Sequence, residues 1–275
     1  MLRSPLGSAG PVRAGVCRRR QQRIAELVAV RGRARIGELA RTLGVTEPTV
    51  RKDLSALQEQ GILKRTHGGA IALRPLADRG LAGRAVTHRD AKAAIGRTCV
   101  HLLEEGDSVF LDSGTTVGAV ATAIAADPKS APRNLVVLTN AIGVATALAG
   151  VPGVEHVLLG GELRTPSGSV VGALAVHNLQ RFTVSVAFIG VSGFSGLGIS
   201  VASAAEAGVK SAVIERARRV IVAADRTKVG ATDFARICDL DDVDAVVLDR
   251  STPEIHELCA HHDVTIIEAG ADPAA

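Results

Sequence analysis

The segment LDSGTTVG, residues 111–118, carries side chains suited to binding an anion. An apolar run ends in an acid, and a turn rich in hydroxyl groups leads into an alanine-rich stretch: Asp112, Ser113, Gly114, Thr115 and Thr116. Gly114 lets the backbone approach an anion closely, the hydroxyls add donors, and the positive end of the following helix faces the same place. This chemistry suits a phosphate group.

Four more polar motifs follow apolar runs further along the chain. They are Thr139-Asn140, Gly160-Gly161, the group Gly190, Ser192 and Gly193, and the group Asp225, Thr227 and Lys228. Each motif alone is typical of a turn or a helix cap. Because ligands of parallel sheets bind beyond the carboxyl ends of the strands, we expect the motifs to converge on one edge. Lys228 would then supply a mobile cation to neutralise a phosphate.

The elements that must position these motifs alternate between strand and helix. Short apolar runs predict strands at 108–112, 134–139, 154–160, 184–190, 219–225, 244–249 and 264–268. Helical patterns occupy 89–106, 117–126, 141–150, 205–217 and 253–260. Strands of this kind between helices predict an α/β domain with a mainly parallel sheet covered on both faces.

The amino-terminal part has a different pattern. Apolar residues at helical spacing predict helices at 19–32, 36–45 and 46–61, and two alternating runs predict a β-hairpin at 62–73. Gly44 suits a tight left-handed turn between two crossed helices. Thr46 is placed as an N-cap, with Pro48 in the first turn, where its missing N–H is not needed.

This order predicts a winged helix-turn-helix whose third helix lies in the major groove of DNA. The exposed residues expected to reach double-stranded operator DNA from that helix are Thr46, Glu47, Thr49, Arg51 and Lys52. Arg51 could contact guanine with two hydrogen bonds, and Lys52 suits a phosphate. Lys64, Arg65 and His67 on the hairpin wing are expected near the DNA backbone. Similar helix pairs also occur in proteins that do not bind DNA.

Charge is divided unevenly along the 275 residues. Residues 1–74 hold fifteen Lys and Arg residues and five Asp and Glu residues, a balance of +10, whereas the remainder has a balance of −6. A small basic unit joined to a larger acidic one favours a polyanion-binding head on a body with another task.

Composition excludes several classes of protein. No apolar stretch approaches the roughly 20 residues of a membrane-spanning helix, so we expect no membrane partner and a cytoplasmic location. With no Trp or Tyr and five Phe, platforms that stack on bases or sugar rings are excluded. Four scattered cysteines favour a reducing compartment, and the cluster His256, Cys259, His261 and His262 has no metal-site spacing. We expect neither a metal nor a cofactor.

The expected boundaries follow from these patterns. We predict a disordered tail at 1–19, a DNA-binding domain at 20–74 and a linker at 75–88, where Pro and Gly interrupt any period. An effector and oligomerisation domain follows at 89–268, with a disordered tail at 269–275.

From about Arg20 to Glu268 the chain resembles the DeoR-type family of bacterial transcriptional repressors. The resemblance rests on the helix-turn-helix sequence and, in order, on LDSGTTV, LTNAIGVA, LLGGELR, VVGALA, AFIGVSG and AADRTKVG. It implies an effector domain related in fold to ribose-phosphate isomerases and CoA transferases, and a phosphorylated sugar or related metabolite as effector. The effector-binding residues that it implies are Asp112, Ser113, Gly114, Thr115, Thr116, Asn140, Gly161 and Lys228.

Three functions remain open for the body of the protein. It could sense a sugar phosphate and shift the DNA affinity of a homo-oligomer. It could serve only as an oligomerisation module that lets two heads span two half-sites. It could also be an isomerase with Asp112 or Glu206 as base, but alanines, serines and a glycine surround Glu206 rather than a second carboxylate. We therefore predict a regulator rather than an enzyme.

Overall fold

The computed structural model describes residues 20–25, 27–28, 33–60, 62–66, 68–72, 81–128 and 131–270. The tail predicted at 1–19, residues 271–275 of the one predicted at 269–275, the linker residues before 81 and His67 lie outside these ranges. The chain divides between Thr87 and His88 into an amino-terminal and a carboxyl-terminal unit.

The amino-terminal unit contains the predicted helices and hairpin. Residues 20–25 and 27–28 are helical, and α2 (Ile36–Leu43) and α3 (Glu47–Glu59) follow. Gly44 adopts the left-handed conformation at the end of α2, with a φ of 63°. Strands β2 (Leu63–Thr66) and β3 (Gly69–Ala72) form the hairpin, and β1 (Arg33–Arg35), which the sequence pattern did not predict, pairs antiparallel with β3.

One apolar core holds this unit together. Periodic apolar positions of the helical segments and the hairpin are buried in it, namely Ile24, Val28, Ile36, Leu39, Val50, Leu54, Leu57 and Leu63. The helical period therefore placed most of the inward positions correctly.

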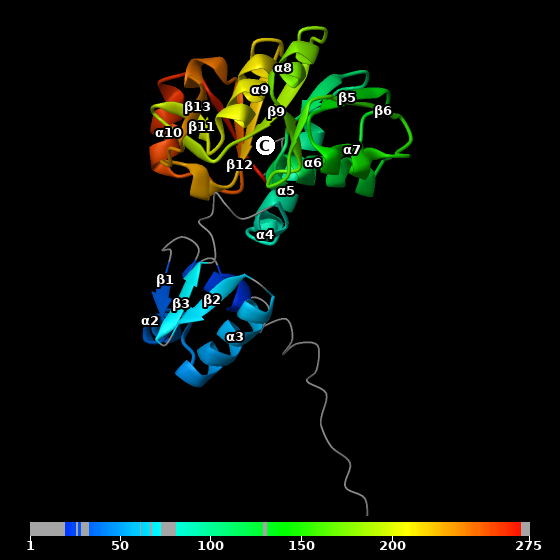
Figure 1. Ribbon diagram of the computed structural model, residues 1–275. Helices are drawn as coiled ribbons and strands as arrows, with labels where there is room; N and C mark the ends of the chain where they lie inside the picture. The colour runs from blue at the N-terminus through cyan, green and yellow to red at the C-terminus, as the bar shows by residue number, and fades with distance from the viewer. Residues whose placement is uncertain are drawn as a thin grey trace, which may run out of the picture. The chain divides into compact units, whose positions relative to one another are not determined.

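The carboxyl-terminal unit is built on a seven-stranded parallel sheet of order β15-β14-β12-β9-β4-β5-β6. Its strands are β4 (Ser108–Leu111), β5 (Leu135–Thr139), β6 (Val154–Leu158), β9 (Val186–Gly190), β12 (Val220–Ala224), β14 (Ala245–Leu248) and β15 (Thr265–Glu268). Figure 1 shows β9 and β12 in the middle of this unit, between α10 (Pro253–Ala260) on one side and β5 and β6 on the other. All seven coincide with predicted strands, so the prediction of a mainly parallel α/β sheet is confirmed.

Helices cover both faces of this sheet. One face packs against α5 (Arg89–His101), α6 (Thr115–Ala126) and α7 (Ile142–Leu148). The other packs against α8 (Ala173–Leu179), α9 (Ala204–Ile214) and α10 (Pro253–Ala260). Burial on both sides is why the strands are continuously apolar: Val109 and Leu111 enter one core and Phe110 the other.

Several short elements were not predicted. A hairpin of β7 (Glu162–Arg164) and β8 (Ser169–Val171) precedes α8, and β10 (Gly193–Ser195), β11 (Gly198–Val201) and β13 (Ala235–Cys238) form a small antiparallel sheet. Helix α4 (Leu81–Ala85) and the 3-10 turns η2 (Arg226–Lys228) and η3 (Leu240–Asp242) complete the unpredicted elements. Helix α4 lies in the predicted linker, which was expected to lack regular structure. Among the described residues, no helix has the length and apolar content to cross a membrane.

Helices α5 and α6 approach each other closely at Gly96. A Cβ atom at this position would lie 2.5 Å from the carbonyl oxygen of Ala119, well inside contact distance. Only a glycine lets α5 lie this close to α6, whose first turn carries the hydroxyl-rich segment.

We expect Gly96→Ala to lower the free energy of unfolding by about 1–3 kcal/mol, because the added methyl group forces the two helices apart. Gly118→Ala on α6 is the matched control, since nothing lies within 4 Å of its added Cβ. It should be neutral or stabilise the helix by up to about 1 kcal/mol. Urea denaturation followed by circular dichroism measures both changes, and equal effects would contradict the close approach.

Candidate functional site

The predicted DNA-reading residues lie on and before the first turns of α3. Thr46 is the N-cap residue, and its Oγ1 lies 2.9 Å from Oγ1 of Thr49. Arg51 is 55% exposed, and its Nη2 donates to Oε2 of Glu47 at 3.0 Å. This ion pair spans one helical turn and holds the guanidinium over the exposed face of α3; Lys52 is exposed beside it.

The hairpin wing is fastened to the same helix. The backbone N–H of Arg65 donates to Oε1 of Gln58 at 2.8 Å, and its Nη1 donates to Oγ of Ser55 at 2.7 Å. Arg65 therefore helps to position the wing, whereas Lys64 is exposed and forms no ion pair with any described residue. The prediction for His67 falls outside the described residues.

Helix α3 is also anchored from its buried side. Asp53 is 1% exposed, and its carboxylate accepts hydrogen bonds from Arg20 Nε at 2.5 Å and Gln21 Nε2 at 3.2 Å. These bonds hold α3 against the first helical segment.

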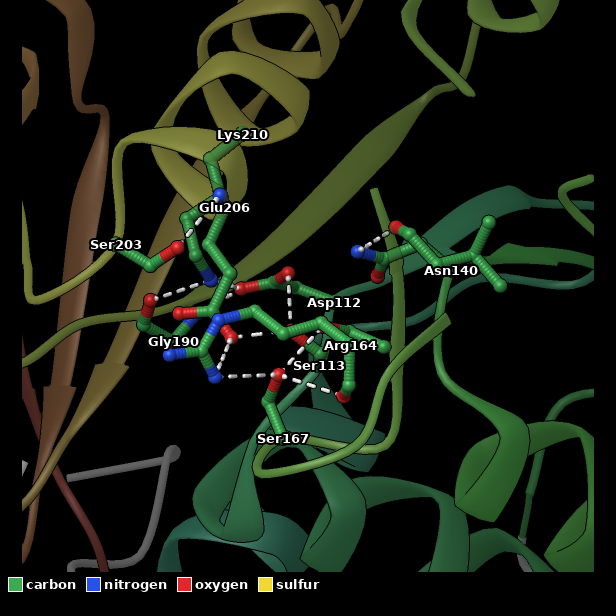
Figure 2. Close-up of polar contacts among 11 residues, drawn as sticks. Asp112, Ser113, Asn140, Arg164, Ser167, Gly190, Ser203, Glu206 and Lys210 are labelled. Atoms are coloured by element: carbon green, nitrogen blue, oxygen red, sulfur yellow. Dashed lines mark hydrogen bonds and ion pairs between the residues drawn. The ribbon is translucent and has the colours of Figure 1, made fainter. Parts of the chain in front are cut away.

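A buried ion pair lies where the hydroxyl-rich segment begins. Asp112 directly follows β4 and is fully buried, and Lys210 of α9 contacts its Oδ2 (Figure 2). Gly190, at the end of β9, donates its N–H to Oδ2 at 2.9 Å and accepts a hydrogen bond from Lys210 Nζ at 2.9 Å. Burial raises the pKa of Asp112, and this effect exceeds the opposing effects of Lys210 and the backbone donors.

The turn after Asp112 leaves donors and space. Gly114 has a φ of 119°, which only glycine adopts readily, and nothing lies within 4 Å of the Cβ position. Helix α6 begins at Thr115, and the hydroxyls of Thr115 and Thr116 have no hydrogen-bond partner among the described residues. Ser113 instead donates to Oδ1 of Asp112 at 3.4 Å.

The Thr139-Asn140 motif has two different roles. Thr139 Oγ1 donates to the carbonyl of Leu111 at 2.6 Å and accepts from the N–H of Ala141 at 3.0 Å, so it fixes the strand end. Asn140 is 1% exposed and donates through Nδ2 to the carbonyl of Val170 at 3.2 Å. Its Oδ1 is buried without a partner among the described residues.

Gly161 lies beside Val170, which is hydrogen-bonded to Asn140, whereas Lys228 follows β12, two strands from β4. A Cβ at Gly161 would lie 2.8 Å from Val170 Cγ1, so this glycine permits close packing of the β7–β8 hairpin. Lys228 lies beyond β12, where its N–H donates to the carbonyl of Asp225 at 3.0 Å. Burial raises the pKa of Asp225, but Lys228, Thr227, His88 and Lys92 together lower it below its usual value.

The unpredicted β7–β8 hairpin and the predicted helix α9 complete the cluster. The β7–β8 hairpin supplies Arg164, Ser167 and Ser169. Helix α9 supplies Glu206 and Lys210, and Ser203 is its N-cap (Figure 2). Of these, only Glu206 was considered from the sequence, and only as a catalytic base. The signal for Lys210 is a lone cation four residues after Glu206 in an otherwise apolar helix, which places both on one face.

In this cluster each buried carboxylate lies beside a cation. Arg164 Nη1 is 3.7 Å from Oε1 of Glu206. Lys210 is in direct contact with Asp112. The charges nearly cancel, and donors and acceptors remain free, an arrangement suited to binding a polar ligand. No group of three His, Cys, Asp or Glu that could hold a metal occurs within the described ranges.

Comparisons with known proteins agree with both units. Residues 20–75 match the family described as "DeoR-like helix-turn-helix domain", and residues 87–250 match "DeoR C terminal sensor domain". The chain belongs to the DeoR family of transcriptional repressors. The predicted resemblance is confirmed.

Several DeoR-family relatives match over most of their length. The transcriptional repressor GlcR of Bacillus subtilis is 35% identical over 216 residues, covering 78% of this chain and 81% of that protein. The repressor AccR of Agrobacterium fabrum is 34% identical, with 86% and 92% covered. The glycerol-3-phosphate regulon repressor of Escherichia coli is 30% identical, with 88% and 96% covered.

Solved structures of other proteins also match this DeoR-family chain. Ribose 5-phosphate isomerase A of Methanocaldococcus jannaschii matches with a TM-score of 0.38 and 13% identity, covering 52% of this chain and 55% of that one. Translation initiation factor eIF-2B of Pyrococcus horikoshii matches with a TM-score of 0.40 and 16% identity, covering 84% and 77%.

We expect Lys210→Met to lower the free energy of unfolding by about 3–5 kcal/mol, because it leaves Asp112 buried without its cation. The double variant Asp112→Asn/Lys210→Met removes both charges and should recover part of that loss. Urea denaturation of the full chain measures both variants. A double variant no more stable than Lys210→Met would contradict the expectation that the loss arises from the unpaired carboxylate of Asp112.

For DNA, we expect Arg51→Ala to weaken binding to a selected operator by about 1–3 kcal/mol and to relax base preference, whereas Lys64→Ala weakens binding to all sequences similarly. The operator is obtained by selection from random duplexes, and fluorescence anisotropy at several salt concentrations gives the affinities. Lys64→Ala should also reduce the salt slope by about 1. Equal losses on operator and random DNA for Arg51→Ala would refute its base-reading role.

Proposed function

We propose that the chain represses transcription under the control of a phosphorylated sugar or related metabolite bound at the carboxyl ends of β4, β5 and β9. The observation that carries the proposal is the open turn at Gly114, where the free hydroxyls of Thr115 and Thr116 lie next to an acid already neutralised by Lys210.

A phosphate suits this turn for electrostatic reasons. Asp112 would repel an anion, but contact with Lys210 offsets its charge. The first turn of α6 offers backbone N–H groups, and no side chain of the described residues caps it. A helix start with free N–H groups and neighbouring hydroxyls binds anions well. Lys228, two strands away along the sheet, is a second cation on the same edge.

The relatives support this choice of ligand and of task. One relative is named for a glycerol-3-phosphate regulon, and several are named repressors. For a ligand to regulate DNA binding, it must bind one conformation of the protein more tightly than another. We propose a homo-oligomer, because a pair of recognition helices can then occupy two half-sites about one helical turn apart.

A thermal-shift screen of phosphorylated sugars and polyols, with their unphosphorylated counterparts, tests the proposal. A ligand at 100 times its Kd should add about 2.7 kcal/mol of stability. Thr115→Ala should weaken binding, whereas Thr122→Ala on the exposed side of the same helix should not. The ligand should also change operator affinity in an anisotropy titration.

The results of this screen distinguish the proposed function from the two alternatives, an oligomerisation module and an isomerase. If no phosphorylated compound stabilises the protein, or if the Thr115 and Thr122 variants behave alike, the carboxyl-terminal unit is better explained as an oligomerisation module alone. Interconversion of aldose and ketose phosphates by the protein would instead favour an isomerase.

A further inference from the structure

The ion pair between Arg164 and Glu206 is looser than its neighbour. Arg164 Nη1 lies 3.7 Å from Glu206 Oε1, beyond hydrogen-bond distance, and the two side chains are 30% and 12% exposed. By contrast, Lys210 is 3% exposed and is in direct contact with Asp112. The Arg164–Glu206 pair is therefore the part of the cluster that a ligand can reach.

Both members of this pair have unused hydrogen-bonding capacity. Glu206 Oε1 accepts from Ser169 Oγ at 3.4 Å, whereas Oε2 has no hydrogen-bond partner among the described residues. Arg164 donates a side-chain hydrogen bond only through Nη1, to Ser167 Oγ at 3.4 Å, so Nε and Nη2 are free within the same ranges. Asn140 Oδ1 is a further acceptor, buried and unpaired.

Free acceptors select the chemistry of the ligand. Phosphate oxygens at neutral pH are acceptors, so a phosphate cannot satisfy Glu206 Oε2 or Asn140 Oδ1, and the carboxylate repels it. A hydroxyl group can donate to a carboxylate and also accept from a guanidinium. Because the chain has no Trp or Tyr to stack on a sugar ring, such hydrogen bonds must supply the recognition.

The Arg164–Glu206 pair is linked through α9 to the turn at residues 113–116, which suits a phosphate. Glu206 lies one helical turn before Lys210 on α9, and Lys210 holds Asp112, the residue before the turn. The hairpin that carries Arg164 is fixed in place, because Val170 N donates to the carbonyl of Asn140 at 2.6 Å.

We propose that Glu206 and Arg164 bind the hydroxyl groups of a phosphorylated polyol or sugar whose phosphate lies at residues 113–116. The pair thereby determines which phosphorylated metabolite is recognised. The inference rests on the proposed function, because it assigns the second end of the same ligand.

The test compares Glu206→Gln with wild type by calorimetric titration of the full chain. The probes are inorganic phosphate and the tightest-binding member of a series of polyol and sugar phosphates with three to six carbons. Replacing one acceptor oxygen by a donor should weaken the hydroxylated probe about 10- to 100-fold, as expected for a hydrogen bond to a charged group. Inorganic phosphate should bind within about twofold of wild type, which also shows that the variant is folded.

Glu162→Gln is the matched control, an exposed carboxylate on the same hairpin, and should change neither affinity. An unchanged preference for the hydroxylated probe in Glu206→Gln overturns the inference. Tighter binding of both probes also overturns it, because Glu206 would then act only by repelling anions. If wild type binds inorganic phosphate as tightly as every hydroxylated probe, this inference fails and the phosphate site stands. If wild type binds none of them, the proposed function itself fails.

Discussion

A buried ion pair between Asp112 and Lys210 sets the geometry of the carboxyl-terminal unit. It joins the end of β4 to α9, and Gly190 ties the end of β9 to both of its members. Charges this deeply buried must stay paired, since an isolated one costs several kcal/mol. The constraint fixes the turn at 113–116 and, one helical turn along α9, the position of Glu206. Asp112 thus serves to position Lys210 and the strand end, and it is too buried to be the group a ligand meets first.

The main architecture was predictable because its signals are local. Each strand of the large sheet is a short apolar run, and the helices around Gly44 follow a 3.6-residue period. The β7–β8 hairpin and the three-stranded sheet were missed because charged residues, Ser or Gly interrupt their short strands, as in ELR, GFS and ARIC, so none forms a continuous apolar run. These strands are held in place by contacts with distant parts of the chain, such as the hydrogen bond from Val170 N to the carbonyl of Asn140.

The sequence predicted those parts of the candidate site that depend only on the order and direction of the strands. Parallel strands bring residues 112–116 and Asn140 to one edge, as expected. Lys210 and Arg164 could not be paired with their partners from the sequence. The contact between Lys210 and Asp112 spans 98 residues, and Arg164 lies on the unpredicted β7–β8 hairpin. The sequence could not show that Val170 packs closely against Gly161, a contact that itself requires a residue without a side chain. The effector-binding role of Gly161 stays a prediction.

Asp225 lies on the same edge of the sheet and is surrounded by Lys228, Lys92 and His88. His88 is the first residue of the carboxyl-terminal unit and stands immediately before α5. The chain thus enters this unit beside the carboxyl ends of the strands and not at the opposite edge of the sheet. It does so where the polar motifs lie and outside both apolar cores, so the packing of the interior does not depend on the point of entry.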